Sequence, residues 1–393
     1  MTGALALEDA QQRLLALARP LGTETIAFTG ALGRTLAQDV CAARTQPAAD
    51  LSAMDGYAVC GEGPWAVKGE SRAGHPYPGQ LKAGQAARIS TGAVMPGGGE
   101  AVLLQEDAAR SGDTVKAVGP PPLPGAHIRR NGFDFHAGDT LLFAGTHITP
   151  AAIAVGLSAG LASIEVTRRP RAVFIDTGDE LAQPGTPCAA HQIPASNSAM
   201  LAALAARIPC DITTAGPVPD RLNALVGAIS SASDADLIVT TGGASVGDHD
   251  LIRPALEALG ASLDFWRVAI KPGKPLLVAQ RGRQVIIGLP GNPVSAYVTG
   301  FLFVLPFLRA LSGNRATAPA PLMLPLAVPL GSGGVRREFI RGILGRNGVT
   351  PLDQTDSSAL RTLSAANVLI ERAAGAQEAK AGTPVPVYLL ENG

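Results

Sequence analysis

Three apolar, β-branched runs between residues 168 and 313 constrain the fold of this chain more than any other feature. They are Ala172–Ile175, Leu237–Val239 and Val285–Ile287. Each run is followed at once by a polar, glycine-bearing loop and then by residues of helical periodicity. Strands that alternate with helices predict a parallel sheet with right-handed crossovers, so we expect an α/β domain here. The helices are expected over residues 197–206, 250–259 and 293–311.

The regions on either side of these runs have different patterns. A helical apolar face covers residues 7–19, and Thr149-Pro150 is typical of the start of a second helix, which ends near Gly160. Between these two helices, short apolar runs divided by Gly and Pro clusters predict a β-rich insertion. After Pro319, short alternating strands predict a C-terminal β-barrel. The expected domains are a discontinuous helical domain (1–44 and 137–167), the β-rich inserted domain (45–136), the α/β domain (168–313) and the barrel (314–393).

Composition excludes several classes of protein. The chain has 393 residues, with 32 Lys and Arg against 32 Asp and Glu, so it lacks the basic surplus of proteins that bind nucleic acid or anionic membranes. Its four cysteines form no C-x-x-C pair, which argues against a zinc ribbon or a dithiol redox motif. The N-terminus has no signal-peptide pattern, and the longest apolar stretches fall short of the roughly 18–20 residues of a bilayer span. We therefore expect a cytoplasmic protein without a nucleic-acid or membrane partner.

Polar loops follow all three runs at the point where each predicted strand ends. Open α/β sheets bind ligands beyond the carboxyl ends of their strands, so these loops are expected to meet at one edge. Their glycines let backbone N–H groups approach a ligand, and the helix that follows each loop favours an anion. A tight turn would explain any one of these loops, whereas three at one edge favour a ligand site. The loops are Thr177–Glu180, Thr241–Asp250 and Leu289–Ser295.

Charged side chains add detail to this prediction. Only six lysines occur in the chain, and two of them, Lys271 and Lys274, lie in the stretch Ile270–Pro275. The flanking prolines stiffen this stretch and hold two point charges close together, which indicates an anion between them unless the stretch is simply a solvated turn. Carboxylates such as Glu180 and Asp250 lie in the predicted edge loops and would repel an anion unless a hard cation bridged them. This pattern favours Mg²⁺ with phosphate oxygens, although Asp250 also suits a helix N-cap.

Other enzyme motifs are missing from the sequence. It contains no G-x-S-x-G, no Walker A motif and no Rossmann G-x-G-x-x-G. Acyl hydrolases, P-loop NTPases and dinucleotide oxidoreductases therefore lose support.

Seven segments together resemble a known family, the molybdopterin molybdenumtransferases (MoeA and the E domain of gephyrin). The segments occur in the order of the family and extend over nearly the whole chain. The combination of GGxSxG, KPGK and LPGNPVS is specific, whereas no one of these motifs would be. The matching segments are Ser52–Ala58, Arg88–Pro96, Ile128–Asp134, Asp176–Leu181, Thr241–Asp250, Ala269–Pro275 and Gly288–Ala296.

The resemblance implies an elongated homodimer with four domains in each chain. It also implies an Mg²⁺-dependent transferase that inserts molybdate into the dithiolene of adenylylated molybdopterin and releases AMP, giving molybdenum cofactor. The catalytic residues implied are Asp55, Glu180, Asp250, Lys271 and Lys274, of which Asp55, Glu180 and Asp250 would hold the metal. The substrate-binding residues expected are Thr91, Arg129, Asp134, Asp220, Gly242, Gly243, Ser245, Gly247, Pro290, Gly291, Asn292, Pro293, Ser295, Arg341 and Ser357.

The expected mechanism follows from the charge of the ligands. Lys271, Lys274 and Arg341 would hold the oxyanion beside the dithiolene, and Mg²⁺ would polarise the pyrophosphate for loss of AMP. No adenylyltransferase domain is found within the sequence, so a separate adenylyltransferase is the expected partner.

Two departures from the family pattern keep alternatives open. Ala195 replaces an aspartate before the second helix, and Thr355-Asp356-Ser357 replaces Gln-Gly-Ser in the C-terminal domain. One alternative is therefore a non-catalytic paralogue that binds the pterin or acts as a scaffold. Another is a nucleotide pyrophosphatase on the same α/β module, as in CinA, which the β-rich insertion and the barrel disfavour.

Overall fold

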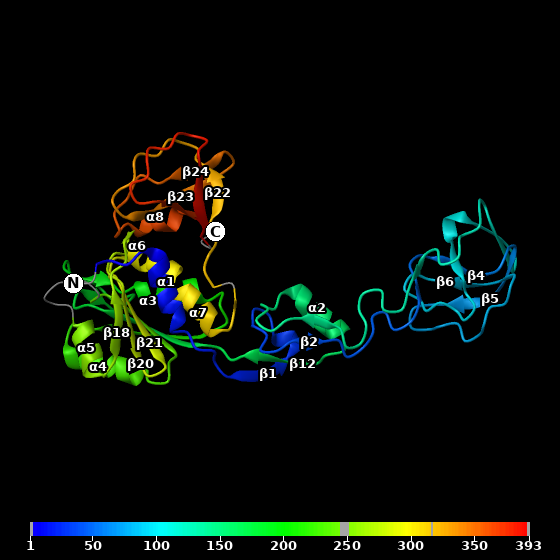
Figure 1. Cartoon of the computed structure of the whole chain (residues 1–393), viewed down its shortest axis with the longest axis horizontal. Coiled ribbons are helices and arrows are strands. Elements are labelled where there is room, and N and C mark those ends of the chain that lie inside the picture. The colour runs from blue at the N-terminus through cyan, green and yellow to red at the C-terminus, as the bar shows by residue number, and fades with distance from the viewer. Residues whose placement is uncertain (1–2, 244–250, 316, 391–393) are drawn as a thin grey trace.

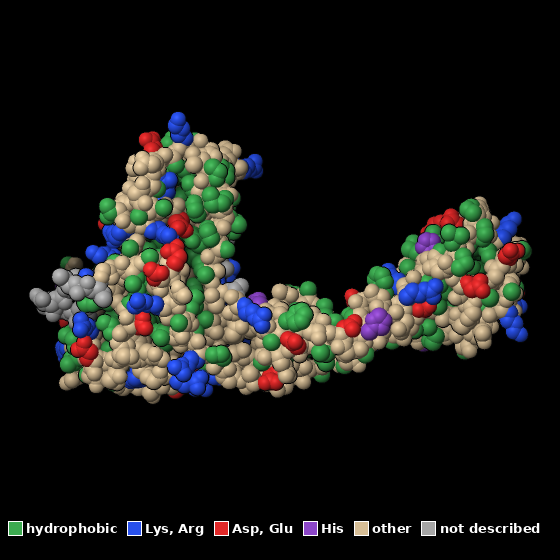
Figure 2. Space-filling view, viewed as in Figure 1, with side chains coloured by type: hydrophobic (Ala, Val, Ile, Leu, Met, Phe, Trp, Pro, Cys, Tyr) green, Lys and Arg blue, Asp and Glu red, His purple; other side chains and the backbone are tan. Residues whose placement is uncertain are grey.

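The computed structural model describes residues 3–243, 251–315 and 317–390 and shows an elongated molecule (Figure 1). The α/β domain and the C-terminal domain lie together at one end, and the β-rich domain lies at the other. A small joining domain lies between them. On the face shown in Figure 2, acidic and basic side chains are interspersed, with no large area of one sign.

The α/β domain contains a six-stranded sheet in the order β16-β13-β17-β21-β20-β18. The three predicted runs are β13, β17 and β21, and they pair in parallel as expected. The strands β18 and β20 were not predicted, and β20 runs antiparallel to both of its neighbours, because the short turn at Gly282-Arg283 reverses the chain between β20 and β21. The strands are β13 (Arg171–Thr177), β16 (Asp211–Val218), β17 (Leu237–Thr241), β18 (Ser262–Trp266), β20 (Leu277–Arg281) and β21 (Gln284–Leu289).

Helices cover both faces of this sheet. On one face, α4 (Leu222–Ser231) packs with α5 (Ile252–Ala258). On the other face lie α3 (Asn197–Ala205) and a long apolar segment made of α6 (Pro293–Thr299), η3 (Gly300–Val304) and α7 (Leu305–Leu311). With 19 residues, this segment is long and apolar enough for a membrane span, which corrects the expectation that no apolar stretch reaches that length. Its most apolar 18-residue window is 89% buried inside the protein, so it packs as a core helix.

The first helix, α1 (Leu7–Ala16), differs from its predicted place in the helical domain. Its buried residues Leu7, Ala10 and Leu14 belong to the core of the α/β domain, against α7. An amphipathic stripe specifies that a helix needs an apolar partner but not which one, and here the long apolar helix supplies it.

The joining domain is built from two small antiparallel pairs and the helix α2 (Pro150–Ser158). The Thr149 hydroxyl accepts a hydrogen bond from Ala152 N at 3.2 Å, so the predicted N-cap is confirmed. Its core centres on Phe28, at the start of η1 (Phe28–Gly30). The pairs are β1 (Thr23–Ala27) with β12 (Ser163–Thr167), and β2 (Val40–Cys41) with β11 (Thr140–Leu142).

The β-rich domain contains a six-stranded sheet in the order β7-β4-β6-β5-β9-β8 and one small pair, β3 with β10. Two of the short apolar runs between the Gly and Pro clusters, residues 86–89 and 101–104, lie in β6 and β7. The elements are β3 (Leu51–Ser52), β4 (Gly56–Cys60), β5 (Trp65–Ser71), β6 (Gln85–Ile89), β7 (Ala101–Leu104), η2 (Gln105–Asp107), β8 (Ala108–Ser111), β9 (Thr114–Ala117) and β10 (Ile128–Arg129).

The C-terminal domain takes one of its strands from the α/β domain. Its sheet has the order β19-β23-β25-β26-β22, with β24 paired to β23, and a bridge from Leu326 to Val349 brings β24 back to the end of β22. The strand β19 (Ile270–Lys271) begins the stretch Ile270–Pro275, which contains Lys271 and Lys274 and is called the lysine loop below, and β19 pairs in parallel with β23. The other elements are β22 (Leu322–Pro325), β23 (Arg337–Gly345), β24 (Gly348–Pro351), α8 (Leu360–Ala365), β25 (Val368–Arg372) and β26 (Pro384–Leu389).

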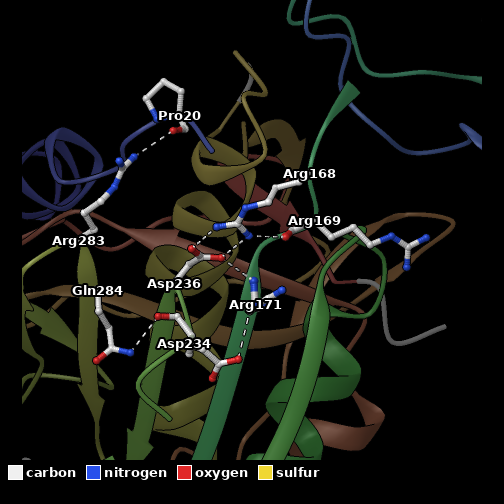
Figure 3. Close-up of polar contacts among 9 residues, drawn as sticks. Pro20, Arg168, Arg169, Arg171, Asp234, Asp236, Arg283 and Gln284 are labelled. Carbon is white, nitrogen blue, oxygen red and sulfur yellow. Dashed lines mark hydrogen bonds and ion pairs between the residues drawn. The ribbon is translucent and has the colours of Figure 1, made fainter. Parts of the chain in front are cut away.

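At the amino edge of the α/β sheet, charged side chains are paired with one another (Figure 3). Arg168 donates two hydrogen bonds to the two carboxylate oxygens of Asp236, at 2.9 and 2.7 Å. Arg171 N also donates to Asp236, and the Arg171 guanidinium lies 3.5 Å from Asp234. These contacts fix the entry of the chain from the joining domain into β13.

Candidate functional site

The described parts of the three predicted loops come together at the carboxyl edge of the sheet. The Thr177 hydroxyl donates to Thr241 O at 3.1 Å, and Gly242 N donates to Leu289 O at 3.2 Å. A Cβ on Gly291 would lie 3.5 Å from the Cα of Gly242. The backbones of the second and third loops therefore approach closely. Ser245, Gly247 and Asp250 fall within residues 244–250, outside the described residues.

Gly242 is required by its backbone conformation. Its φ is +95°, and an added Cβ would lie 2.3 Å from Thr177 O. Only glycine fits there without moving the backbone of the first loop. The neighbouring Gly243 also has a positive φ, +61°.

A buried carboxylate that the sequence analysis did not single out holds this edge together. Asp176 is 3% exposed and accepts hydrogen bonds from Ser198 N, the Ser198 hydroxyl and the Thr241 hydroxyl, at 3.0, 2.7 and 2.6 Å. It fixes the start of α3 to the ends of β13 and β17. The sequence signal that could have identified Asp176 is its position directly after the apolar run Ala172–Ile175.

Two predicted acidic positions lie at the same edge. The exposed Glu180 follows β13 and lies over Gly178, where an added Cβ would be 2.4 Å from its Oε2. Asp220 follows β16, and its backbone N donates to Asp179 Oδ1 at 3.1 Å. Acidic groups from two neighbouring strands therefore gather beside the glycine loops. The nearby strands β14 (Leu181–Ala182) and β15 (Ile193–Pro194) pair with each other.

The lysine loop lies at the seam between the α/β and C-terminal domains. Lys271 Nζ lies 3.0 Å from Glu338 Oε1 of β23, so Lys271 has a counterion that its sequence neighbourhood does not supply. Lys271, Val294, Glu338, Arg341 and Thr355 are among the residues around a cleft of about 90 Å³. The exposed Lys274 forms no ion pair with any residue in the described part of the chain.

Arg341 is buried in the wall of this cleft. Its guanidinium donates to the backbone oxygens of Ala359, Gln354 and Asp356, at 3.1, 2.5 and 2.9 Å. Burial lowers the pKa of Arg341 below its ordinary value. Arg341 therefore shapes the loop that carries Ser357.

Ser357 contacts the third edge loop. Asn292 Nδ2 donates to the Ser357 hydroxyl at 2.9 Å, and Val294 N donates to Ser357 O at 3.0 Å. The extra carboxylate of this loop, Asp356, accepts two hydrogen bonds from Ser358, and these hydrogen bonds lower its pKa. Pro293 begins α6, and Ser295 is buried in its first turn. Asn292 and Pro293, together with Pro290 before them, thus lie where the two domains meet.

Asn197, the first residue of α3, links this helix to the third edge loop, Leu289–Ser295. Its Nδ2 donates to Gly291 O at 2.7 Å, and its buried Oδ1 has no hydrogen-bond partner among the residues that the structure describes. Ala195, the departure from the family pattern, is buried just before this helix.

The predicted residues of the β-rich domain lie far from this edge in the same chain (Figure 1). There, the Asp55 carboxylate accepts hydrogen bonds from Thr91 N and from the Thr91 hydroxyl, at 2.6 and 3.0 Å, and these lower its pKa. Arg129, on β10, and Asp134 are both exposed. One chain therefore does not bring these four residues to Lys271 and Glu180. Within the described ranges, no cluster of three or more His, Cys, Asp or Glu side chains suits a metal ion.

Comparison with known proteins accounts for all four domains. Residues 5–160 match the MoeA N-terminal region (domain I and II), residues 173–310 a probable molybdopterin binding domain, and residues 323–390 the MoeA C-terminal region (domain IV). The molybdopterin molybdenumtransferase of Haemophilus influenzae is 35% identical over 86% of this chain and 85% of its own length. The chain belongs to the MoeA family. Molybdopterin molybdenumtransferase 2 of Mycobacterium tuberculosis, also 35% identical, aligns over 98% of this chain and 99% of its own length.

Solved structures of MoeA proteins have the same fold over the full chain. A molybdopterin biosynthesis MoeA protein from Pyrococcus horikoshii, 25% identical, superposes with a TM-score of 0.85 over 98% of this chain and 100% of its own. The predicted family and the predicted multidomain α/β fold are thus confirmed. The matched regions contain the segments that carried the resemblance in the sequence.

Proposed function

We propose that this chain is a molybdopterin molybdenumtransferase, which inserts molybdate into adenylylated molybdopterin and releases AMP to give molybdenum cofactor. The observation that carries the proposal is the seam described above. There, Lys271, the Ser357 loop and the third glycine loop converge beside the carboxyl edge of the α/β sheet. Membership of the MoeA family supports the same reaction.

The residues of this edge suit the two anionic parts of the substrates. Backbone N–H groups of the glycine loops and the start of α6 suit the pyrophosphate, because helix N-termini and close backbone amides favour negative charge. Lys271 and Lys274 suit the oxyanion, and Lys274 has no competing ion pair among the described residues. Arg341 contributes by fixing the loop of Ser357 rather than by a free guanidinium.

The donors present fit Mg²⁺, which binds oxygen ligands from a few carboxylates, substrate phosphates and water. Glu180 is exposed at the edge, and both hydrogen bonds to Asp55 fall on Oδ1, which leaves Oδ2 available. Glu180, Asp250 and Asp55 would hold the ion, which would supply positive charge beside the pyrophosphate. Asp250 lies outside the described residues.

A second copy of the chain would complete the site. The β-rich domain, which carries Asp55, Thr91 and Arg129, lies at the other end of the molecule from the α/β domain (Figure 1), and Asp134 precedes Phe135, which packs against Ala42 and Ala159 of the joining domain. We therefore propose a homodimer in which the β-rich domain of one subunit faces the α/β domain of the other. Mixing the inactive variants Asp55→Ala and Lys274→Ala tests this arrangement. Random exchange of subunits should restore about one quarter of wild-type activity, since half of the dimers carry one intact site. No restoration would contradict a shared site.

The substrate of this reaction requires a second enzyme in the same compartment. We propose that a separate adenylyltransferase supplies the adenylylated pterin and that both proteins act in the cytoplasm. A purified pair of the two proteins should produce molybdenum cofactor from molybdopterin, ATP and molybdate, whereas either protein alone should not.

The direct test of function is AMP release. Purified protein, adenylylated molybdopterin and Mg²⁺ are mixed with or without molybdate, and AMP is followed by chromatography. Molybdate-dependent AMP release is the expected result. Tight pterin binding without AMP release would instead support the non-catalytic paralogue, and Ala195→Asp and Asp356→Gly would then be the first reversions to test. Hydrolysis of free dinucleotides without molybdate would support a pyrophosphatase.

A further inference from the structure

The ion pair between Lys271 and Glu338 occupies the cleft that the proposed function assigns to the oxyanion. We propose that Glu338 is an internal competitor of the oxyanion for Lys271 and limits how tightly the cleft holds a dianion. This inference depends on the proposed function, because it takes the cleft beside Lys271 as the oxyanion site.

The two residues are held opposite each other by the backbone. In the parallel pairing of β19 with β23, Lys271 is the register partner of Glu338. The Glu338 side chain is 15% exposed and that of Lys271 is 53% exposed, with Nζ and Oε1 3.0 Å apart. The carboxylate is therefore a fixed part of the cleft wall, while the lysine is open to an incoming ligand.

The Glu338 carboxylate and an oxyanion are the same kind of partner for Lys271. Both offer anionic oxygens to the same ammonium, so an oxyanion that binds Lys271 must displace or share this contact. Among the described residues around the cleft, Lys271 and Arg341 carry positive charge and Glu338 carries negative charge. The net charge of this group is thus +1, and loss of the carboxylate would raise it to +2.

A competing interpretation gives the opposite result in a binding experiment. If the pair were only a strut between two domains that positions Lys271, removal of Glu338 would misplace the lysine and weaken anion binding. If Glu338 competes with the ligand, its removal strengthens binding. The gain should be larger for a dianion than for a monoanion, because the Coulomb energy is proportional to the charge of the ligand.

A competing carboxylate suits a site from which the bound oxyanion must be transferred to the dithiolene. An oxyanion that is held equally tightly before and during the reaction gains nothing in turnover, and a very tight ground state slows its transfer to the dithiolene. A built-in carboxylate weakens the resting complex without removing the lysine that the reaction needs.

The test compares tungstate with perrhenate, two tetrahedral oxyanions of similar size that differ by one charge. Calorimetric titrations at fixed ionic strength measure both affinities in the wild type, in Glu338→Gln and in Glu371→Gln. Glu371 is the matched control, because it lies in the same sheet, is 14% exposed and pairs with Arg337 at 3.4 Å. It does not line the cleft.

The competitor model predicts that Glu338→Gln binds tungstate about tenfold more tightly and perrhenate about threefold more tightly, while Glu371→Gln matches the wild type. Unchanged or weaker tungstate binding in Glu338→Gln would overturn it, as would equal gains in Glu371→Gln. Absence of tungstate binding by the wild type would overturn it too.

A second variant keeps the test informative if Glu338→Gln fails to fold. Glu338→Asp keeps the charge but withdraws the carboxylate from Lys271, so its tungstate affinity should lie between those of the wild type and the glutamine variant. An affinity below that of the wild type would contradict competition. AMP release by the wild type is measured in parallel, because tungstate binding without AMP release would count against the proposed function and not against the competition.

Discussion

The two edges of the α/β sheet differ in whether their charged side chains have ionic partners. At the amino edge, Arg168 and Asp236 satisfy each other with two hydrogen bonds, and Arg171 lies beside Asp234 (Figure 3). At the carboxyl edge, Lys274 has no ionic partner among the described residues. Both edges belong to the same sheet, so the difference in ion pairing comes from the loops at each edge.

This difference separates structural charge from charge that is available to a ligand. A charge that is paired and partly buried has little left to offer a substrate, and removal of its partner destabilises the fold. A charge kept apart beside glycines and a cleft retains its capacity to bind an anion. Lys271 is intermediate, because its partner Glu338 lies in the cleft itself.

The largest expected effect is on Lys274. Lys274→Ala should lower molybdate-dependent AMP release by about 100-fold or more, because the proposed oxyanion site loses a cation that has no ion pair among the described residues. The same change should leave stability nearly unchanged. Lys380→Ala, another exposed lysine of the neighbouring domain, is the control. Retained turnover in Lys274→Ala would remove this residue from the mechanism.

The buried Asp176 tests whether the stability of the carboxyl edge depends on a carboxylate that accepts hydrogen bonds from neighbouring elements. Asp176→Ala should lower the free energy of unfolding by about 3 kcal/mol, because three hydrogen-bond donors lose a charged acceptor in the interior. Urea unfolding followed by circular dichroism measures this loss. A change below about 1 kcal/mol would show that the edge relaxes without the carboxylate.

At the amino edge, Asp236→Ala should lower the free energy of unfolding by about 2 kcal/mol. Its tungstate affinity should match that of the wild type, since the edge is remote from the lysine loop. Asp234→Ala, which removes a largely exposed partner, should cost less than about 0.5 kcal/mol. Weaker tungstate binding in Asp236→Ala would break the separation between the two edges.

The smallest effect concerns the cysteine just before β16. Burial raises the pKa of the Cys210 thiol to about 11, so at pH 8 very little of it is the reactive thiolate. Iodoacetamide at that pH should modify the exposed Cys41 and Cys188 well before Cys210, as peptide mass spectrometry would show. Equal modification of Cys210 would mean that the amino edge opens readily.

Sequence patterns predicted the parts of this molecule that are set locally. The runs that form β13, β17 and β21, and the cap at Thr149, follow from short-range periodicity and from hydrogen bonds between near neighbours. The family motifs singled out Glu180, Gly242 and Lys271, which lie at the carboxyl edge, but they also singled out Asp55 and Thr91, which belong to the β-rich domain at the other end of the molecule.

Contacts between distant segments could not be predicted in this way. The pairing of Lys271 with Glu338 joins residues 67 positions apart through a strand shared by two domains. The docking of α1 on α7 depends on which apolar surface is nearest in space. The role of Asp176 depends on donors from α3 and β17, which no local pattern specifies.

The position of bound tungstate would show whether the seam between the α/β and C-terminal domains is the oxyanion site. Crystals soaked in tungstate and measured at the tungsten absorption edge would place the metal by its anomalous signal. We expect the strongest peak in the cleft beside Lys271, within reach of Lys274 and of the loop that carries Ser357. A cleft without a peak in crystals that bind tungstate elsewhere would contradict the assignment of this seam as the oxyanion site.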